Sequence, residues 1–127
     1  MILSAEEFVR LRTSEKEEEY NLAAHSEAPM EVWLEVIEKY PGYREWVAHN
    51  KKVPIEILEI LANDSDDRVR STVATKRKLS PKLFQKLAKD PDEGVRQRIA
   101  CYPPIDIIKT AGLNGFEFGE KMGRFPN

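Results

Sequence analysis

The sequence contains one cysteine, Cys101, among 127 residues. A single cysteine excludes an internal disulfide, and a cysteine-rich metal or iron–sulfur centre cannot be built from it. Long apolar runs are also missing, because charged residues make up 33% of the chain, and the N-terminus has no basic segment followed by an apolar one. We therefore expect no membrane span, no secretory signal and a cytoplasmic location. The length suits a single domain, residues 1–127.

Motifs that carry catalysis are missing too. The chain has no glycine-rich phosphate-binding loop and no glycine elbow around a serine. Its two histidines, His25 and His49, have no nearby third ligand for a metal, and we interpret them as turn residues. The acidic run at residues 15–19 is typical of a helix start rather than of an acid/base pair. We expect no enzyme activity and no cofactor.

Charge is nearly balanced over the whole chain but not along it. Residues 1–40 carry ten acidic and four basic side chains, whereas residues 41–127 carry twelve acidic and sixteen basic ones. An acidic start followed by a basic remainder indicates a charged partner. The alternative is a solvated surface without a specific partner.

A repeat of about 26 residues runs through the middle of the chain. The segment Val-Arg-Ser-Thr-Val-Ala at residues 69–74 recurs as Val-Arg-Gln-Arg-Ile-Ala at 95–100, and residues 53–64 resemble residues 79–90 at the same offset. Residues 43–48 hold an earlier copy of the first segment, and a weaker copy begins near residue 20. The repeats therefore cover residues 20–104, with alanine at four equivalent positions: Ala23, Ala48, Ala74 and Ala100.

Each repeat copy is predicted to contain two short helices. In the longer helix, apolar residues fall at positions i, i+1, i+4 and i+5, as at Leu83, Phe84, Leu87 and Ala88, which places them on one stripe. The shorter helix spans about two turns and needs its neighbours for stability. No β-type alternation of useful length occurs, so the predicted fold class is all-α.

Residue pairs with cap chemistry predict where helices begin. Ser4 with Glu7 and Ser14 with Glu17 have the spacing of a capping box, so two N-terminal capping helices are expected within residues 1–19. A hydrogen-bond acceptor followed by proline at the first helical position predicts two further starts: Ser80-Pro81 and Asp90-Pro91.

Residues 105–127 depart from the repeat. Four of the six glycines lie there, together with Phe116, Phe118 and Phe125. Glycine at this density opposes a helix, whereas the phenylalanines would cover the open end of a stack of repeats. We interpret the segment as a C-terminal cap; a mobile tail and a partner-binding segment are the alternatives.

The repeat resembles the leucine-rich repeat variant family, a bacterial relative in shape of HEAT and armadillo repeats. The resemblance rests on Val-Arg-x-x-Val-Ala, a polar turn, a proline, a Leu-Leu-x-x-Leu-Ala helix and Asp-Pro-Asp, and it is strongest at residues 43–93. It implies a short right-handed α-solenoid without a catalytic centre, and roles in protein binding, including neutralisation of toxins, with nucleic-acid binding as a further role. Some members hold an iron–sulfur centre on an N-terminal cysteine cluster, which this chain lacks.

Two kinds of residue recur in register within the repeats. Stacked helical repeats commonly use such residues to bond neighbouring copies and to satisfy helix ends, and we interpret them as a structural ladder rather than as a binding site. The ladder comprises Arg44, Arg70, Arg96, Asp64 and Asp90.

The turn between the two helices of a copy is basic in two successive copies. Stacking would gather five cations on one edge: Lys51, Lys52, Lys76, Arg77 and Lys78. An acidic protein or a phosphate backbone would compensate their repulsion, and a solvated loop with acidic neighbours is the alternative.

Trp46 stands where the other copies have Thr72 and Arg98. A tryptophan at a polar position is a candidate contact residue, although it could equally pack against Tyr20 or the N-terminal helices. Trp33 matches Leu58 and Phe84 and is therefore predicted to lie in the core.

The leading functional hypothesis is a non-catalytic protein–protein interaction scaffold for a partner with an acidic surface, with an immunity or adaptor role as its most specific form. The competing hypothesis is nucleic-acid binding through the five cations. The net charge of -2, the acidic first 40 residues and the lack of an aromatic-rich stacking surface oppose it.

Overall fold

The computed structural model describes residues 1–76 and 78–101, and within these ranges all regular structure is helical. The all-α prediction is therefore confirmed for this part of the chain, whereas the solenoid arrangement and its period stay predictions. The predicted C-terminal cap at 105–127 falls outside the described residues. None of the described helices is long and apolar enough to cross a membrane.

The chain divides into two compact units, Met1–Leu61 and Ala62–Asn127, called unit 1 and unit 2 below. Whether they act as the single domain expected from the length stays a prediction.

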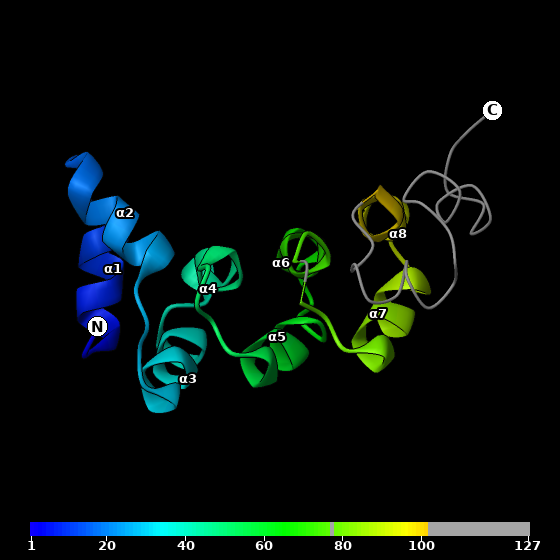
Figure 1. The fold of residues 1–127 in the computed structure, drawn as a ribbon, viewed down its shortest axis with the longest axis horizontal. Helices are drawn as coiled ribbons and strands as arrows, with labels where there is room; N and C mark the ends of the chain where they lie inside the picture. The colour runs from blue at the N-terminus through cyan, green and yellow to red at the C-terminus, as the bar shows by residue number, and fades with distance from the viewer. Residues whose placement is uncertain (77, 102–127) are drawn as a thin grey trace. The chain divides into compact units, whose positions relative to one another are not determined.

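Unit 1 contains five α-helices and a short 3₁₀ turn. They are α1 (Ala5–Thr13), α2 (Glu17–His25), α3 (Met30–Lys39), the 3₁₀ turn η1 (Pro41–Tyr43), α4 (Arg44–His49) and α5 (Ile55–Leu61). Helix α1 packs against α2 and α3, and α3 in turn contacts α4 and α5 (Figure 1).

The core of unit 1 is built around Trp33. Its ring is fully buried and meets the edge of Phe8 at 5.3 Å between ring centroids, with an interplanar angle of 79°. Edge-to-face contact is a preferred arrangement of two aromatic rings, and it joins α1 to α3. Val36, Val47 and Ile57 also belong to this core, and the two repeat alanines of unit 1, Ala23 and Ala48, are buried as well.

The two predicted capping boxes have different outcomes. Ser4 caps α1 as expected, because its hydroxyl accepts the N–H of Glu7 at 3.0 Å and the Glu7 carboxylate accepts the N–H of Leu3 at 3.0 Å. The second prediction is wrong: Ser14 donates to the Glu19 carboxylate at 2.8 Å, and α2 begins after Lys16 without a side-chain cap. Glu19 also receives Arg10 at 2.7 Å, which joins α1 to α2.

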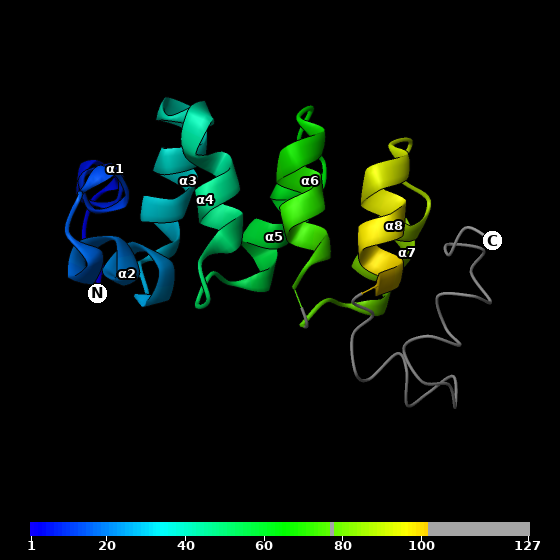
Figure 2. The same cartoon turned by 90° about the horizontal axis from the view of Figure 1, so that it is seen from above.

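Unit 2 contains three described helices: α6 (Asp67–Ala74), α7 (Pro81–Ala88) and α8 (Glu93–Cys101). Helices α6 and α8 contact each other, and both contact α7 (Figure 2). The apolar stripes predicted from the repeat form the core, because they are buried in all three helices: Val69, Val73, Leu83, Phe84, Leu87, Val95 and Ile99. Ala74 and Ala100 are buried among them.

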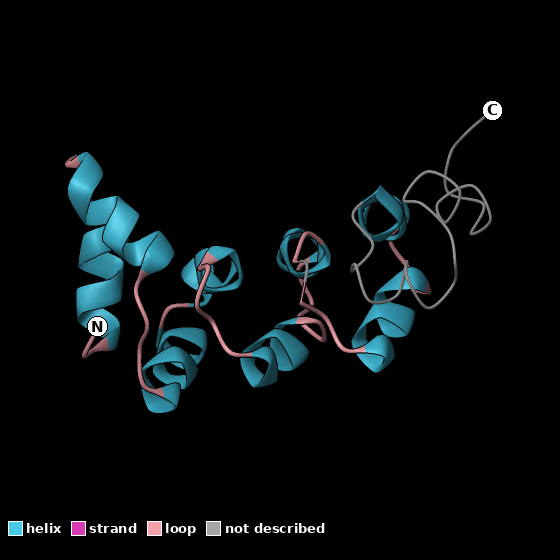
Figure 3. Cartoon of the chain, viewed as in Figure 1, coloured by secondary structure: helices cyan, strands magenta, loops and turns pink. Residues whose placement is uncertain are grey.

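Helix starts in unit 2 agree with the sequence at one position and differ at another. Ser80 caps α7 by accepting the N–H of Leu83 at 3.2 Å, with Pro81 as the first helical residue. Asp90 was predicted to cap the next helix, and that prediction is wrong. The carboxylate of Asp92 accepts the N–H of Val95 at 3.0 Å instead, and α8 begins at Glu93. Loops, pink in Figure 3, connect the helices within each unit.

Candidate functional site

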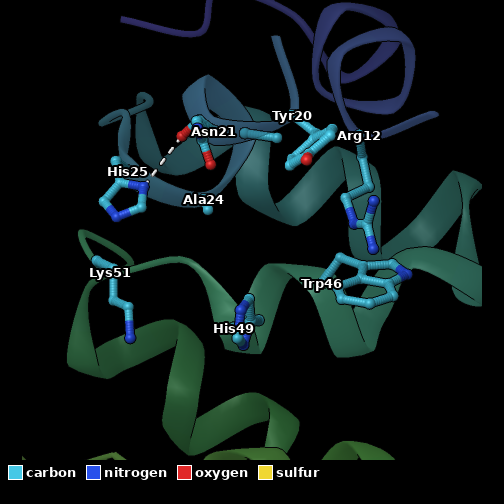
Figure 4. A pocket seen from close by; sticks show the side chains of 9 residues that line it. Arg12, Tyr20, Asn21, Ala24, His25, Trp46, His49 and Lys51 are labelled. Carbon is cyan, nitrogen blue, oxygen red and sulfur yellow. Dashed lines mark hydrogen bonds between the residues drawn. The ribbon is translucent and has the colours of Figure 1, made fainter. Parts of the chain in front are cut away.

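Unit 1 contains a groove of about 390 Å³ between α2 and α4. Helix α1 contributes Arg12, α2 contributes one wall, and α4 with its following turn contributes the other (Figure 4). Nine residues line the groove: Arg12, Tyr20, Asn21, Ala23, Ala24, His25, Trp46, His49 and Lys51. Two residues singled out in the sequence, Trp46 and Lys51, therefore line one cavity with both histidines of the chain.

A stack of a cation on an aromatic ring dominates one end of the groove. The Arg12 guanidinium carbon lies 3.5 Å from the centroid of the Trp46 ring, which is within the range of a cation–π contact. His49 meets the same indole edge to face at 5.9 Å between centroids. Trp46 is half-buried, and it packs against an arginine of the first helix rather than standing out into solvent.

A buried asparagine holds the two walls of the groove together. Asn50, which follows α4, is fully buried, and its side-chain amide donates to the carbonyls of Ala23 at 2.7 Å and Ser26 at 3.0 Å. Its own carbonyl oxygen accepts the N–H of Lys52 at 2.7 Å, while Lys51 donates its N–H to the carbonyl of Ala24 at 2.7 Å. The orphan carbonyls at the end of α2 are thus satisfied by the turn after α4, which fixes the position of Lys51.

Sequence reasoning missed Asn50. Its counterpart 26 residues later is Lys76, so the repeat offers no asparagine to notice at this position. The only available signal was local: an asparagine between a predicted helix and a proline is a common turn residue, but that says nothing of a partner 27 residues away.

The lining of the groove is basic. Among the residues that line it, Arg12 and Lys51 are cations, His25 and His49 add two imidazole rings, and none of the lining residues is acidic. The nearby Glu19 is already paired with Arg10, and this hydrogen bond, followed by that of Ser14, holds the pKa of the Glu19 carboxyl below its ordinary value. The groove can therefore accept negative charge from outside.

A second hollow, of about 590 Å³, adjoins the same stack. It is lined by Arg12, Thr13, Ser14, Gly42, Tyr43 and Trp46. Because Arg12 and Trp46 line both spaces, their stack stands where the groove and this second hollow meet.

The predicted basic edge is placed only in part. Lys51 and Lys52 are exposed in the turn after α4 of unit 1, and Lys51 alone lines the groove. Lys76 and Lys78 belong to the turn after α6 of unit 2, where Lys78 is exposed, and Arg77 lies outside the described residues. A common patch of all five cations stays a prediction.

The residues of the predicted ladder make hydrogen bonds near helix ends. Arg44 donates to the carbonyl of Ile37 at 2.8 Å, Arg70 to that of Asp64 at 2.8 Å, and Arg96 to that of Asp90 at 2.6 Å. Ile37 lies in the last turn of α3, whereas Asp64 and Asp90 lie in the turns after α5 and α7. Carbonyls in and just after the last turn have no helical partner, so each guanidinium satisfies a group that would otherwise need water.

The pair of Arg70 and Asp90 is the most buried ion pair described in unit 2. Nε and Nη2 of Arg70 donate to the two carboxylate oxygens at 2.9 and 3.2 Å, and the side chains are 13% and 2% exposed. This hydrogen bond raises the pKa of Arg70 above its ordinary value. Asp90 also accepts the N–H of Asp92 at 2.9 Å, and Asp64 accepts that of Asp66 at the same distance, so both aspartates organise the turn that follows them.

No metal site is present in the described part of the chain, because no three His, Cys, Asp or Glu side chains there form a group that could hold an ion.

Comparison of the chain with known protein families, with curated proteins and with solved structures found no match. The resemblance to the leucine-rich repeat variant family accordingly stays a prediction.

Proposed function

We propose that this chain is a non-catalytic protein-binding module whose groove in unit 1 takes an acidic segment of a partner protein. The observation that carries the proposal is the lining of the groove, where Arg12, His25, His49 and Lys51 surround a space without an acidic residue. Complementary charge attracts such a partner and fixes how it docks. An adaptor or immunity role would be the specific form of this activity.

The aromatic content of the groove supports a protein partner. Tyr20 and Trp46 present partly exposed rings beside Arg12. These three residue types are the ones most enriched at energetically important positions of protein interfaces, because each combines a large rigid surface with a polar group.

Capture from a native lysate tests this proposal. The immobilised wild-type chain is compared with Lys51→Glu, which reverses a charge in the groove, and with Lys82→Glu, which makes the same change at an exposed position of α7. We expect a protein that wild type and Lys82→Glu retain at micromolar concentration and that Lys51→Glu loses. Retention of nothing by a folded wild-type chain, or of the same proteins by all three, would refute the proposal.

Binding of single-stranded nucleic acid is the second candidate, because the groove combines cations with two aromatic rings on which bases could stack. The net charge of -2 opposes it. A mobility-shift assay with DNA and RNA near about 50 mM salt separates the two functions, since affinity for a phosphate backbone is highest at low salt. Absence of a shift there would exclude the nucleic-acid function.

A further inference from the structure

Arg12 differs from the other arginine of its helix in what it contacts. Arg10 pairs with Glu19 at 2.7 Å. Arg12 lies 3.5 Å above the indole of Trp46, and within residues 1–76 and 78–101 its guanidinium has no hydrogen-bond or ion-pair partner. Stacking occupies the face of a guanidinium and leaves the N–H groups at its edge available, in a fixed fork that matches a carboxylate.

The position of the stack indicates what kind of ligand it meets. The groove and the second hollow both border it, and both are open to solvent. A chain can therefore pass over the stack in both directions, unlike a chain end that fills a closed pocket. Helix α4, which carries Trp46, has six residues and is about 9 Å long, the reach of about three extended residues.

We propose that the Arg12–Trp46 stack receives a side-chain carboxylate from an extended acidic segment of the partner, laid along α4. This inference rests on the proposed function and names the chemical group of the partner that the groove binds. Arg12 binds the central carboxylate through its edge. Lys51 attracts a second carboxylate at the other end of the groove, and the chain continues over the second hollow, which Thr13, Ser14 and Tyr43 help to line.

Stacking also prepares Arg12 for this task. A free arginine side chain loses rotamer freedom when it binds, whereas contact with the indole already restricts this one. The carboxylate bond therefore costs less ordering than it would at an exposed arginine such as Arg98 of α8. Lysine at position 12 would keep the charge but lose the planar fork.

Titration with a synthetic peptide tests the inference. The probe is acetyl-Gly-Glu-Glu-Glu-Gly-amide, and the same peptide with glutamine is the neutral control. Nuclear magnetic resonance follows the side-chain N–H signals of Arg12 and Trp46, while Trp33, which is fully buried, serves as an internal reference. We expect saturable shifts of the first two signals with the glutamate peptide, no shift of Trp33, and no binding of the glutamine peptide.

Two arginine-to-lysine variants distinguish the effect of the planar guanidinium on binding from the effect of its positive charge. Arg12→Lys should weaken binding at least tenfold, and Arg98→Lys should leave it unchanged. Lys51→Gln should weaken binding by a smaller factor that disappears at high salt, because a lone exposed cation acts through screened attraction. Helical circular dichroism and the Trp33 signal verify that each variant is folded.

Each outcome decides one of the two proposals. If Arg12→Lys binds the glutamate peptide as wild type does, or a phosphoserine peptide binds more tightly than the glutamate peptide, the carboxylate assignment is wrong and the proposed function stands. If wild type ignores the glutamate peptide at millimolar concentration but still captures a protein through Lys51, the inference alone is wrong. If the peptide binds but capture from lysate fails, the proposed function is wrong.

Discussion

Replacing Arg70 with methionine should destabilise unit 2 by about 3–5 kcal/mol, the usual cost of removing one partner from a buried ion pair. Arg70 gives the Asp90 carboxylate two hydrogen bonds and gives the carbonyl of Asp64 a third. Methionine replaces the apolar stem of the arginine but none of these donors.

The magnitude follows from what Asp90 would keep. Its side chain is 2% exposed, and among the described residues its carboxylate would retain only the N–H of Asp92, at 2.9 Å. A buried charge with one neutral donor is poorly compensated. Asp90→Asn in the Arg70→Met background removes that charge, so we expect a double-mutant cycle to give a coupling energy of about 2 kcal/mol.

Urea denaturation followed by circular dichroism measures these differences, provided that the slope of the transition is unchanged. Two matched arginine-to-methionine controls show how much of the loss of stability comes from the bond to the carboxylate. Arg96→Met loses bonds to two backbone carbonyls but no carboxylate and should cost about 1–2 kcal/mol. Arg98→Met, at an exposed position, should stay within about 0.5 kcal/mol of wild type. A loss below about 1 kcal/mol for Arg70→Met, or equal losses for all three variants, would refute the reasoning.

Three further predictions concern the packing and the charges. Asn50→Ala should cost about 2–4 kcal/mol in urea denaturation, because two backbone carbonyls and one backbone N–H lose a buried partner; a loss like that of an exposed residue would contradict the role of Asn50. Ala74→Leu should cost about 1–3 kcal/mol by overpacking a fully buried position, whereas Lys78→Glu should barely change the thermal melt; the reverse order would refute the assignment of inside and outside. The hydrogen bond from Arg10 lowers the pKa of Glu19, so the ionised Glu19 stabilises the folded protein above the ordinary pKa of 4.5 and loses this effect as the pH falls below it. The difference in urea midpoint between wild type and Glu19→Gln should therefore shrink between pH 7 and pH 3. A constant difference would contradict this reasoning.

Local patterns in the sequence were sufficient where a helix needs only its own residues. The stripe at Leu83, Phe84 and Leu87 is buried as predicted, and Ser80 caps the helix that carries it. Period and capping chemistry act within a few residues, so they can be read without knowing the rest of the chain.

The same patterns failed where a contact with another helix engaged the side chain that was expected to cap a helix. Ser14 has the spacing of a capping box, but the packing of α1 on α2 brings Arg10 and Glu19 together and draws the Ser14 hydroxyl to that carboxylate. In Asp90-Pro91-Asp92, either aspartate satisfies the cap pattern; Asp92 takes it because Asp90 is held by Arg70 from another helix.

The sequence by itself determined that the described chain is helical, that Trp33 is buried, and that the apolar stripe at Leu83, Phe84 and Leu87 lies inside. Those properties follow from spacing along one helix. Only the tertiary structure decided where the groove forms. Arg12 contacts Trp46, 34 residues away, and Asn50 contacts Ala23, 27 residues away, and no spacing rule in the sequence predicts either contact. Contacts between residues so far apart depend on how whole helices pack, and packing is set by the sum of many buried surfaces rather than by any motif.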